Sequence, residues 1–82
     1  MTNLPSGWTE QGHLLTRTFE FKNFLEAVAF VNKIAAVAEE AQHHPDLEMF
    51  SYRNVRVKTS THDAGNIVTQ KDMDLAEKIN AL

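Results

Sequence analysis

The sequence predicts an α+β domain in which a four-stranded antiparallel sheet carries its helices on one face, with the elements in the order ββαββα. Two stretches of alternating apolar and polar residues are typical of half-buried strands. A long helical pattern lies between them, and a second, shorter one closes the chain. No repeat, low-complexity tract or linker interrupts the 82 residues, so residues 1–82 are expected to form a single domain.

The first two strands are predicted from a short segment and a longer alternating one. Residues 8–11 can form a short strand, and Gln11-Gly12 supplies a turn. Residues 13–21 then alternate, which is the pattern of a strand with one solvated face. The apolar face carries Leu15, Phe19 and Phe21, and the polar face carries Thr16, Thr18 and Glu20.

The strongest helix signal runs from Asn23 to Gln42. Asn23 is a preferred N-cap residue, and Glu26 stands at the capping-box position. One predicted stripe holds Phe24, Val28, Val31, Ala35 and Ala38, and Phe30, Ile34 and Val37 widen it. A helix this apolar is expected to be buried on two sides, the second side against another subunit. Pro45 ends the helix and should leave His44 extended.

The remaining elements are two strands, or one bent strand, followed by a helix. The strands are predicted over residues 48–52 and 54–61, and residues 63–66 read as a turn. The second strand places Val55, Val57, Thr59 and Thr61 on one face and Arg56, Lys58 and Ser60 on the other. Thr69 should cap the last helix with Asp72 in its capping box, and the predicted buried stripe is Leu75, Ala76, Ile79 and Leu82.

The composition excludes several classes of protein. An apolar fraction of 43% argues against disorder, and the chain contains no cysteine for disulfides or a structural zinc site. Net charge is −3 and the only basic cluster is Arg53, Arg56 and Lys58, so direct nucleic-acid binding is not expected. No apolar run approaches the roughly 20 residues that cross a bilayer, and residues 1–8 lack signal-peptide features. We expect a cytoplasmic protein with no membrane partner.

Three of the four histidines fall in two polar segments, each close to a carboxylate. His43 and His44 follow Glu39, and His62 precedes Asp63. Imidazole can give or take a proton near neutral pH, so this arrangement suggests acid–base chemistry. Glu39 lies four residues before His43, so the two are predicted to touch on one helix face, which would favour a protonated His43.

Each of these residues also has a structural reading. Glu39 and His43 could form an idle surface pair, His44 could fill the turn before proline, and His62 could simply end a strand. Asp72 could serve only as a helix cap. His13 has no acidic neighbour and reads as surface structure. A metal site is not expected, because adjacent histidines seldom converge on one ion. A cofactor is not expected either, because the sequence contains no phosphate-binding loop and no nucleophile motif.

The pattern resembles the pterin-4a-carbinolamine dehydratases, which are also known as dimerisation cofactors of a homeodomain transcription factor. The resemblance is carried by Glu39-x-x-x-His43-His44-Pro45, Tyr52, Thr61-His62 and Asp72, and it extends from Gly7-Trp8 to Leu75-Ala76. It implies the same sheet-and-helix fold, assembled as a homodimer or homotetramer. It also implies dehydration of 4a-hydroxytetrahydropterin to quinonoid dihydropterin without a cofactor, which recycles tetrahydropterin for aromatic amino acid hydroxylases.

By the same resemblance, the catalytic set is His43, His44, His62 and Asp72. The residues expected to bind substrate are Glu39, Pro45, Ser60, Thr61, Asp63, Trp8 and Tyr52. His44 and His62 are expected to move protons at the 4a-hydroxyl and N5, with His43 providing binding or charge. The alternative is a non-catalytic dimerisation module that acts as a transcriptional coactivator. The chain departs from the family pattern by one extra residue in each of two segments, 46–51 and 63–69.

Overall fold

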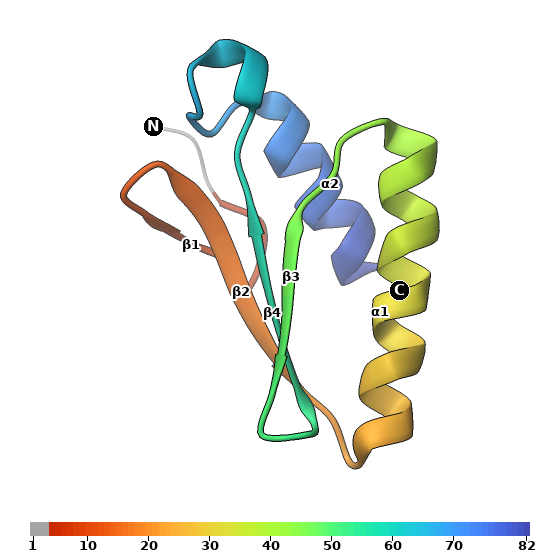
Figure 1. The fold of residues 1–82 in the computed structure, drawn as a ribbon. Helices are drawn as coiled ribbons and strands as arrows, with labels where there is room; N and C mark the ends of the chain where they lie inside the picture. Colours follow the sequence, from red (N-terminus) through yellow and green to blue (C-terminus); the bar gives the residue numbers. More distant parts are fainter. Residues whose placement is uncertain (1–3) are drawn as a thin grey trace.

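The structure is a computed structural model that describes residues 4–82, so the first three residues of the predicted domain lie outside the described part. The elements follow the predicted ββαββα order (Figure 1). They are β1 (Thr9–Gln11), β2 (Leu14–Glu20), α1 (Phe24–Ala41), β3 (Asp46–Phe50), β4 (Asn54–Thr59), the short 3-10 helix η1 (His62–Ala64) and α2 (Gln70–Asn80).

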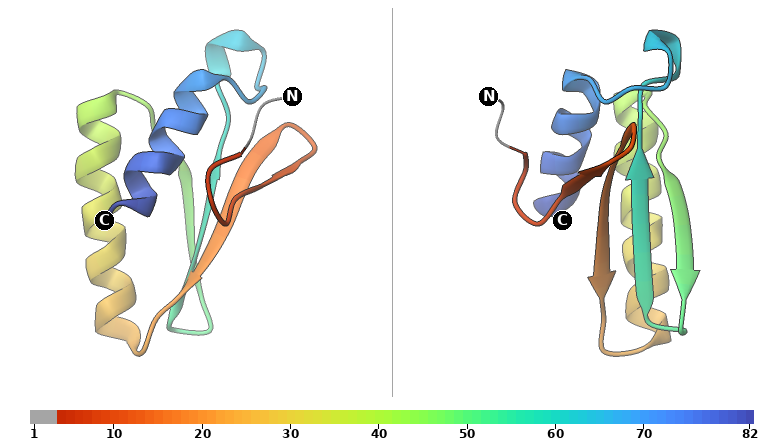
Figure 2. Two further views of the ribbon diagram at one scale, coloured as in Figure 1. Left: turned by 180° about the vertical axis from the view of Figure 1, so that it is seen from behind. Right: turned by 90° about the vertical axis from the view of Figure 1, so that its left-hand side faces the viewer.

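The four strands form one antiparallel sheet in the order β1-β2-β4-β3. Both α-helices cover the same face of this sheet, which confirms the predicted two-layer α+β fold (Figure 2). The other face is uncovered. Neither helix of residues 4–82 combines the length and apolarity needed to cross a bilayer.

The ends of β3 and β4 differ from the prediction. β3 ends at Phe50, because Ser51 and Tyr52 adopt left-handed conformations (φ 49° and 55°) that turn the chain back into β4. β4 ends at Thr59, and Thr61 instead forms an isolated bridge with Ile67 across the η1 turn. Of the two segments with an extra residue, 63–69 runs through the end of η1 and the loop before α2, whereas 46–51 consists of β3 and the first residue of the turn that follows it.

The start of α1 confirms the predicted cap. The Asn23 side chain accepts a hydrogen bond from the Glu26 backbone N–H at 2.9 Å. In a capping box the Glu26 carboxylate would accept from the backbone N–H of Asn23. Here it accepts instead from the backbone N–H of Lys22, one residue earlier, at 3.1 Å. The helix is therefore fixed at its first turn from both directions.

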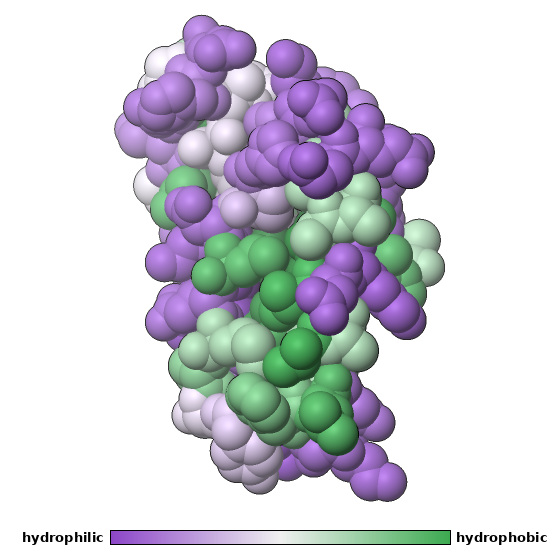
Figure 3. Space-filling view, turned by 45° about the vertical axis from the view of Figure 1, so that its right-hand side comes forward, coloured by the Kyte–Doolittle hydropathy of each residue, from purple (hydrophilic) through white to green (hydrophobic). Residues whose placement is uncertain are grey.

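The prediction for the apolar face of α1 is correct only in part, because Phe30 and Ile34, which were expected to widen the stripe, lie at the centre of the buried face. The core-facing residues are Ala27, Phe30, Ile34 and Ala38. In the predicted stripe only Ala38 is buried, while Phe24 and Ala35 are exposed and Val28 and Val31 are half-buried. Phe24, Val28, Val31 and Ala35 form an apolar flank of the helix. This flank leaves apolar surface on the side of the molecule that carries α1 (Figure 3).

The core lies between the sheet and the two helices. It contains the predicted strand residues Leu15, Val55 and Val57, and the predicted helix residues Leu75, Ala76 and Ile79, whereas Leu82 is exposed. Phe30 packs against Phe19 and Phe21, with ring centroids 4.7 and 4.9 Å apart. These contacts fix α1 on the sheet. The last turn of α1, the η1 turn and the start of α2 all lie at one end of the molecule (Figure 1).

Candidate active site

The C-terminal end of α1 directs the two adjacent histidines. Gln42 ends the helix in a left-handed conformation (φ 52°), and the His43 backbone N–H closes the turn on the Ala38 carbonyl at 3.1 Å. The chain therefore leaves the helix axis at Gln42. This change of direction places His43 against α2 and leaves His44 exposed.

Asp72 is the most connected side chain of the site, and it is completely buried. Its Oδ1 accepts hydrogen bonds from the Thr59 hydroxyl and His43 Nε2, both at 2.6 Å. Its Oδ2 accepts from the Thr61 hydroxyl at 2.7 Å and from the Thr69 backbone N–H at 2.9 Å. Asp72 therefore caps α2, as predicted, and also holds a histidine.

The electrostatics of Asp72 decide which atom of His43 carries a hydrogen. Burial alone would raise the pKa of Asp72, but the hydrogen bonds from His43, Thr59, Thr69 and Thr61 outweigh it and hold the pKa below its ordinary value. Asp72 is therefore a carboxylate at neutral pH and can only accept hydrogen bonds. His43 must donate through Nε2, which leaves Nδ1 as its second functional nitrogen.

The predicted partner of Glu39 was wrong. The Glu39 carboxylate contacts His44 Nε2, and His43 is paired with Asp72 instead. The four-residue spacing between Glu39 and His43 brings side chains together only while the helix continues, and here it ends at Ala41. Both members of the Glu39–His44 pair are exposed to solvent, whereas the His43 side chain is only 12% exposed.

The three predicted histidines border one hollow of about 260 Å³. His43 and His44 come from the end of α1, and His62 lies in η1 after β4. The complete lining is Gln42, His43, His44, Ser60, Thr61, His62, Asp63 and Lys71. Segments that are distant in sequence therefore place the titratable groups around a shared space.

Five predicted site residues do not line this hollow: Glu39 and Asp72, which hold the histidines, and Pro45, Trp8 and Tyr52. Pro45 is half-buried next to the histidines but does not line it. Trp8 is 4% exposed, belongs to the hydrophobic core, and donates its Nε1–H to Asn80 Oδ1 at 2.8 Å. Tyr52 is 61% exposed and lies in the β3–β4 turn, at the opposite end of the molecule (Figure 1). Within one chain, neither aromatic ring reaches the histidines.

The structure adds residues that the sequence analysis did not assign to the site. Lys71 and Gln42 line the histidine hollow, and Thr59 holds Asp72 from β4. A hydroxyl on the apolar face of a strand, in line with Val55 and Val57, is the signal that could have indicated Thr59. Lys71 gives no such signal, because an exposed lysine in a first helical turn is common.

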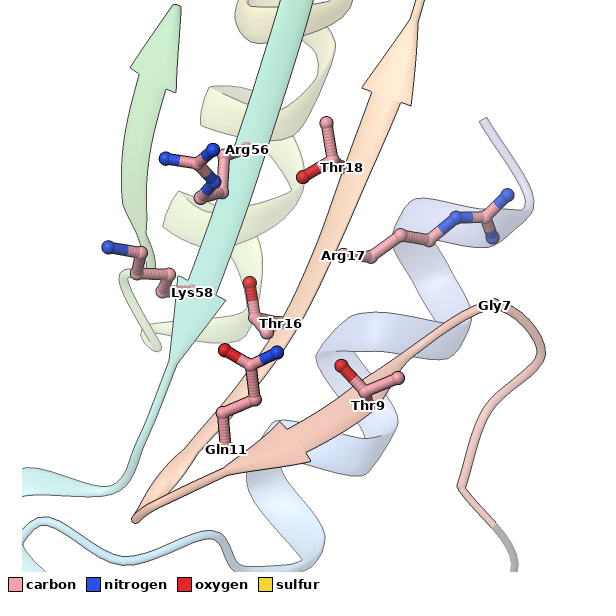
Figure 4. Close-up of a pocket in the computed structure, with 8 residues that line it drawn as sticks. All are labelled: Gly7, Thr9, Gln11, Thr16, Arg17, Thr18, Arg56 and Lys58. Carbon is pink, nitrogen blue, oxygen red and sulfur yellow. The ribbon is translucent and has the colours of Figure 1, made fainter.

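Two larger hollows lie elsewhere and hold no histidine. One of about 460 Å³ lies on the uncovered face of the sheet, where Thr16 and Thr18 of β2 stand beside Arg56 and Lys58 of β4 (Figure 4). The other is an apolar groove of about 400 Å³ beside Phe19, Phe21 and Phe30. In residues 4–82, no three histidine, cysteine or acidic side chains are grouped to hold a metal ion. The histidine hollow is therefore the best candidate for a catalytic centre.

Comparison with known proteins identifies the family to which the whole chain is similar. A sequence profile described as "Pterin 4 alpha carbinolamine dehydratase" matches residues 1–82. A protein of Trichormus variabilis, provisionally named pterin-4-alpha-carbinolamine dehydratase, is 53% identical over 77 residues, which cover 94% of this chain and 81% of that protein. A Sulfolobus acidocaldarius protein with the same provisional name is 49% identical over 76 residues, covering 93% and 81%.

Two solved structures are also similar. The crystal structure of a transcriptional coactivator/pterin dehydratase from Brucella melitensis superposes with a TM-score of 0.85 at 37% identity, covering 93% of this chain and 81% of that one. A pterin dehydratase-like protein identified as a RuBisCO assembly factor in the α-carboxysome has a TM-score of 0.75 at 26% identity, covering 92% and 87%. Similar folds therefore occur in a protein named as a coactivator and dehydratase and in one named as an assembly factor.

Proposed function

This chain belongs to the pterin 4 alpha carbinolamine dehydratase family, and we propose that it removes water from 4a-hydroxytetrahydropterin to give quinonoid dihydropterin. The observation that carries the proposal is the convergence of His43, His44 and His62 on one hollow. A protein that served only as a scaffold would have no need for three proton-transfer groups around a shared space.

The reaction needs two proton transfers at neighbouring atoms of the substrate. The bond between C4a and its hydroxyl oxygen breaks, and the oxygen takes a proton and leaves as water. N5 loses its proton, and the electron pair of that N–H bond forms the C4a–N5 double bond. A well-placed acid and base each contribute roughly 10²–10⁴-fold to such a step.

We assign these transfers to His44 and His62, which lie on the exposed rim of the hollow. His44 is oriented by the Glu39 carboxylate, and His62 is followed by Asp63. In this assignment Ser60 and Asp63 contact the substrate from the end of β4 and η1. The Thr61 hydroxyl is already bonded to Asp72, so its role in the proposal is to hold that carboxylate.

His43 has a different role because Asp72 anchors it. With Nε2 donating to Asp72, the ring is held at one angle and can present only Nδ1 to a ligand. We propose that this fixed ring binds the pterin and stabilises charge that develops on it. The contacts around Asp72 thus support a binding role for His43, and the carboxylate of Asp72 takes the place that the sequence suggested for Glu39.

The test is an assay of 4a-hydroxytetrahydropterin dehydration with purified protein and three single variants, His43→Ala, His44→Ala and His62→Ala. We expect kcat to fall about 10²-fold or more in His44→Ala and His62→Ala, because each loses one proton transfer. His43→Ala should mainly raise KM. His13→Ala is the matched control, because His13 is exposed and lies outside the hollow.

Thermal unfolding of each variant separates a lost group from a lost fold. Full activity in His44→Ala would contradict its assignment as a proton-transfer residue. If the unmodified protein gave no turnover above the uncatalysed rate, the proposed enzyme function itself would fail.

A second candidate function is a non-catalytic protein-binding module or transcriptional coactivator. It is favoured by the roles named for the two similar solved structures, a transcriptional coactivator/pterin dehydratase and an assembly factor. A variant that lacks all three site histidines distinguishes the two functions. Loss of dehydration in this variant supports the enzyme, whereas a protein with no dehydration in either form would favour the binding module.

The cellular setting follows from the proposed reaction. We propose that the protein acts in the cytoplasm as a homodimer or homotetramer and recycles tetrahydropterin for an aromatic amino acid hydroxylase. The partial exposure of the apolar flank of α1 supports the assembly.

A further inference from the structure

Thr59 carries a buried hydroxyl at a position where the core needs only an apolar side chain. It is 2% exposed and lies at the end of β4, on the same face as the core residues Val55 and Val57. A buried hydroxyl costs free energy unless it is hydrogen-bonded, whereas valine would fill the position without that cost. Within residues 4–82, the Thr59 side chain donates to Asp72 Oδ1 at 2.6 Å. The contact with Asp72 therefore explains why a hydroxyl is present here.

The start of α2 accounts for the contacts of only one Asp72 oxygen. Oδ2 accepts from the Thr69 backbone N–H at 2.9 Å, which is the capping contact, and from the Thr61 hydroxyl at 2.7 Å. Oδ1 accepts from Thr59 and from His43 Nε2, both at 2.6 Å. Neither of these two bonds is the capping contact. Thr59 therefore shares its acceptor oxygen with the site histidine.

The bonds to Oδ2 do not by themselves fix the position of Oδ1. The terminal torsion of an aspartate side chain is broad, so holding one carboxylate oxygen leaves the other able to swing. His43 does not fix Oδ1 either, because the turn after α1 carries its ring, which rotates about two side-chain bonds of its own. Without Thr59, Oδ1 and the ring can shift together while they stay bonded to each other.

Thr59 supplies a fixed point from the middle of the sheet. β4 is an inner strand with β2 on one side and β3 on the other, and Thr59 is paired with the fully buried Leu15 of β2. Threonine is branched at Cβ, which restricts its first side-chain torsion. The hydroxyl therefore has a defined place relative to the sheet. It fixes Oδ1 and, through Oδ1, the ring of His43.

We propose that Thr59 is a positioning residue, whose hydroxyl holds Asp72 Oδ1 where this oxygen orients the His43 ring for ligand binding. Thr59 does not line the histidine hollow, so it acts through Asp72 and not by touching the ligand. The inference rests on the proposed function, because it assumes that His43 binds the pterin. The orientation of the His43 ring can nevertheless be measured without any ligand.

The test compares Thr59→Val, which removes the hydroxyl and keeps nearly the same shape, with Thr59→Ser, which keeps the hydroxyl. Val55→Ala is the control for lost stability, because it shortens a fully buried side chain on the same face of β4 that takes no part in the Asp72 hydrogen bonds. The first measurement is NMR of the ligand-free protein with ¹⁵N-labelled histidines. The His43 Nε2–H should give a proton signal that exchanges slowly with water, and its absence in His43→Ala assigns it.

In Thr59→Val we expect this Nε2–H to exchange with water about tenfold faster, because Oδ1 no longer holds the ring in one place. Thr59→Ser should keep the slow exchange. Val55→Ala should keep it too, although this variant unfolds at a lower temperature. In Thr59→Val, KM for 4a-hydroxytetrahydropterin and Kd for a stable 7,8-dihydropterin should both rise about three- to tenfold, with kcat changed less than about twofold.

Slow exchange of the His43 Nε2–H in Thr59→Val would overturn the proposal. Equally fast exchange in Thr59→Val and Val55→Ala would also overturn it, since the cause would then be general destabilisation. The same holds if exchange became faster in Thr59→Val while KM and Kd stayed unchanged. If the unmodified protein showed neither turnover nor pterin binding, the proposed function would fail, and the NMR comparison would still decide whether Thr59 positions His43.

Discussion

Asp72 combines a structural and a functional contact in one buried carboxylate. It accepts hydrogen bonds at the start of α2 and from His43, and these bonds hold its pKa below the ordinary value against the effect of burial. A carboxylate with a lowered folded-state pKa stabilises the fold at pH values above its unfolded pKa. That contribution is lost as the pH falls through the folded-state pKa.

We therefore predict that the free energy of unfolding decreases on acidification below about pH 4, and that Asp72→Asn flattens this decrease. At pH 7 the variant should be less stable by about 2–4 kcal/mol, because the amide NH₂ would face groups that also donate. Urea unfolding at several pH values measures both effects. Asp74→Asn, an exposed change in the same helical turn, is the control, and an unchanged pH dependence in Asp72→Asn would contradict the prediction.

The identity of the site residues could be predicted from the sequence better than their contacts. Histidine next to carboxylate is a visible pattern, and the hollow does bring His43, His44 and His62 together. The pairing of Glu39 was wrong because it depends on the conformation of one residue, Gln42, and glutamine does not signal a left-handed helix end as glycine does. Side-chain contacts across the fold, such as Thr59 to Asp72, have no local signature.

At the scale of elements, the turn between β3 and β4 is the clearest departure from expectation. Ser51 and Tyr52 both have positive φ, although neither is glycine, asparagine or aspartate. Such conformations cost roughly 1 kcal/mol or more for residues with a Cβ. The strand prediction extended through Tyr52 because an aromatic residue favours strands and gives no turn signal.

Replacing Tyr52 by glycine should therefore stabilise the protein by up to about 1 kcal/mol, because glycine adopts this conformation without strain. The increase would be seen as a higher midpoint of thermal unfolding. Tyr52→Ala removes the same ring but keeps the strain, so it should not be stabilising. If Tyr52→Gly were the less stable of the two, ring contacts would outweigh backbone strain at this turn.

The helix starts were the most predictable element boundaries. Asn23 and Thr69 are strong N-cap residues, and both accept the hydrogen bonds that capping requires. The rotation of α1 was less predictable, because apolar residues cover too much of its circumference to define one face. Of the predicted apolar residues, Phe30 and Ile34 face the core, whereas Phe24 and Ala35 are exposed. Only packing against Phe19 and Phe21 distinguishes these faces.

At the scale of the whole molecule, the apolar flank of α1 leads to a prediction about assembly. Phe24 and Ala35 are exposed and lie beside the buried face of the helix, whereas Ala36 is exposed on a different side. We expect a homo-oligomer that buries this flank, because an 82-residue domain has a small core of its own. Burial against a second copy would explain why the helix is so apolar.

Ala35→Glu should therefore shift the protein towards the monomer, as measured by sedimentation velocity, because it places a charge in the proposed interface. Ala36→Glu is the matched control, since it adds the same charge one position along and should leave the assembly intact. A monomeric unmodified protein, or equal effects of both substitutions, would contradict the prediction. The sequence alone could suggest an assembly but could not identify its surface, because that depends on the rotation of α1.

The buried contacts of Asp72 also constrain any redesign of this scaffold for new chemistry. Replacing His43 with another side chain would remove one hydrogen-bond donor from a carboxylate that still begins α2. The new side chain would have to supply a donor at the same point, or the start of the helix would weaken.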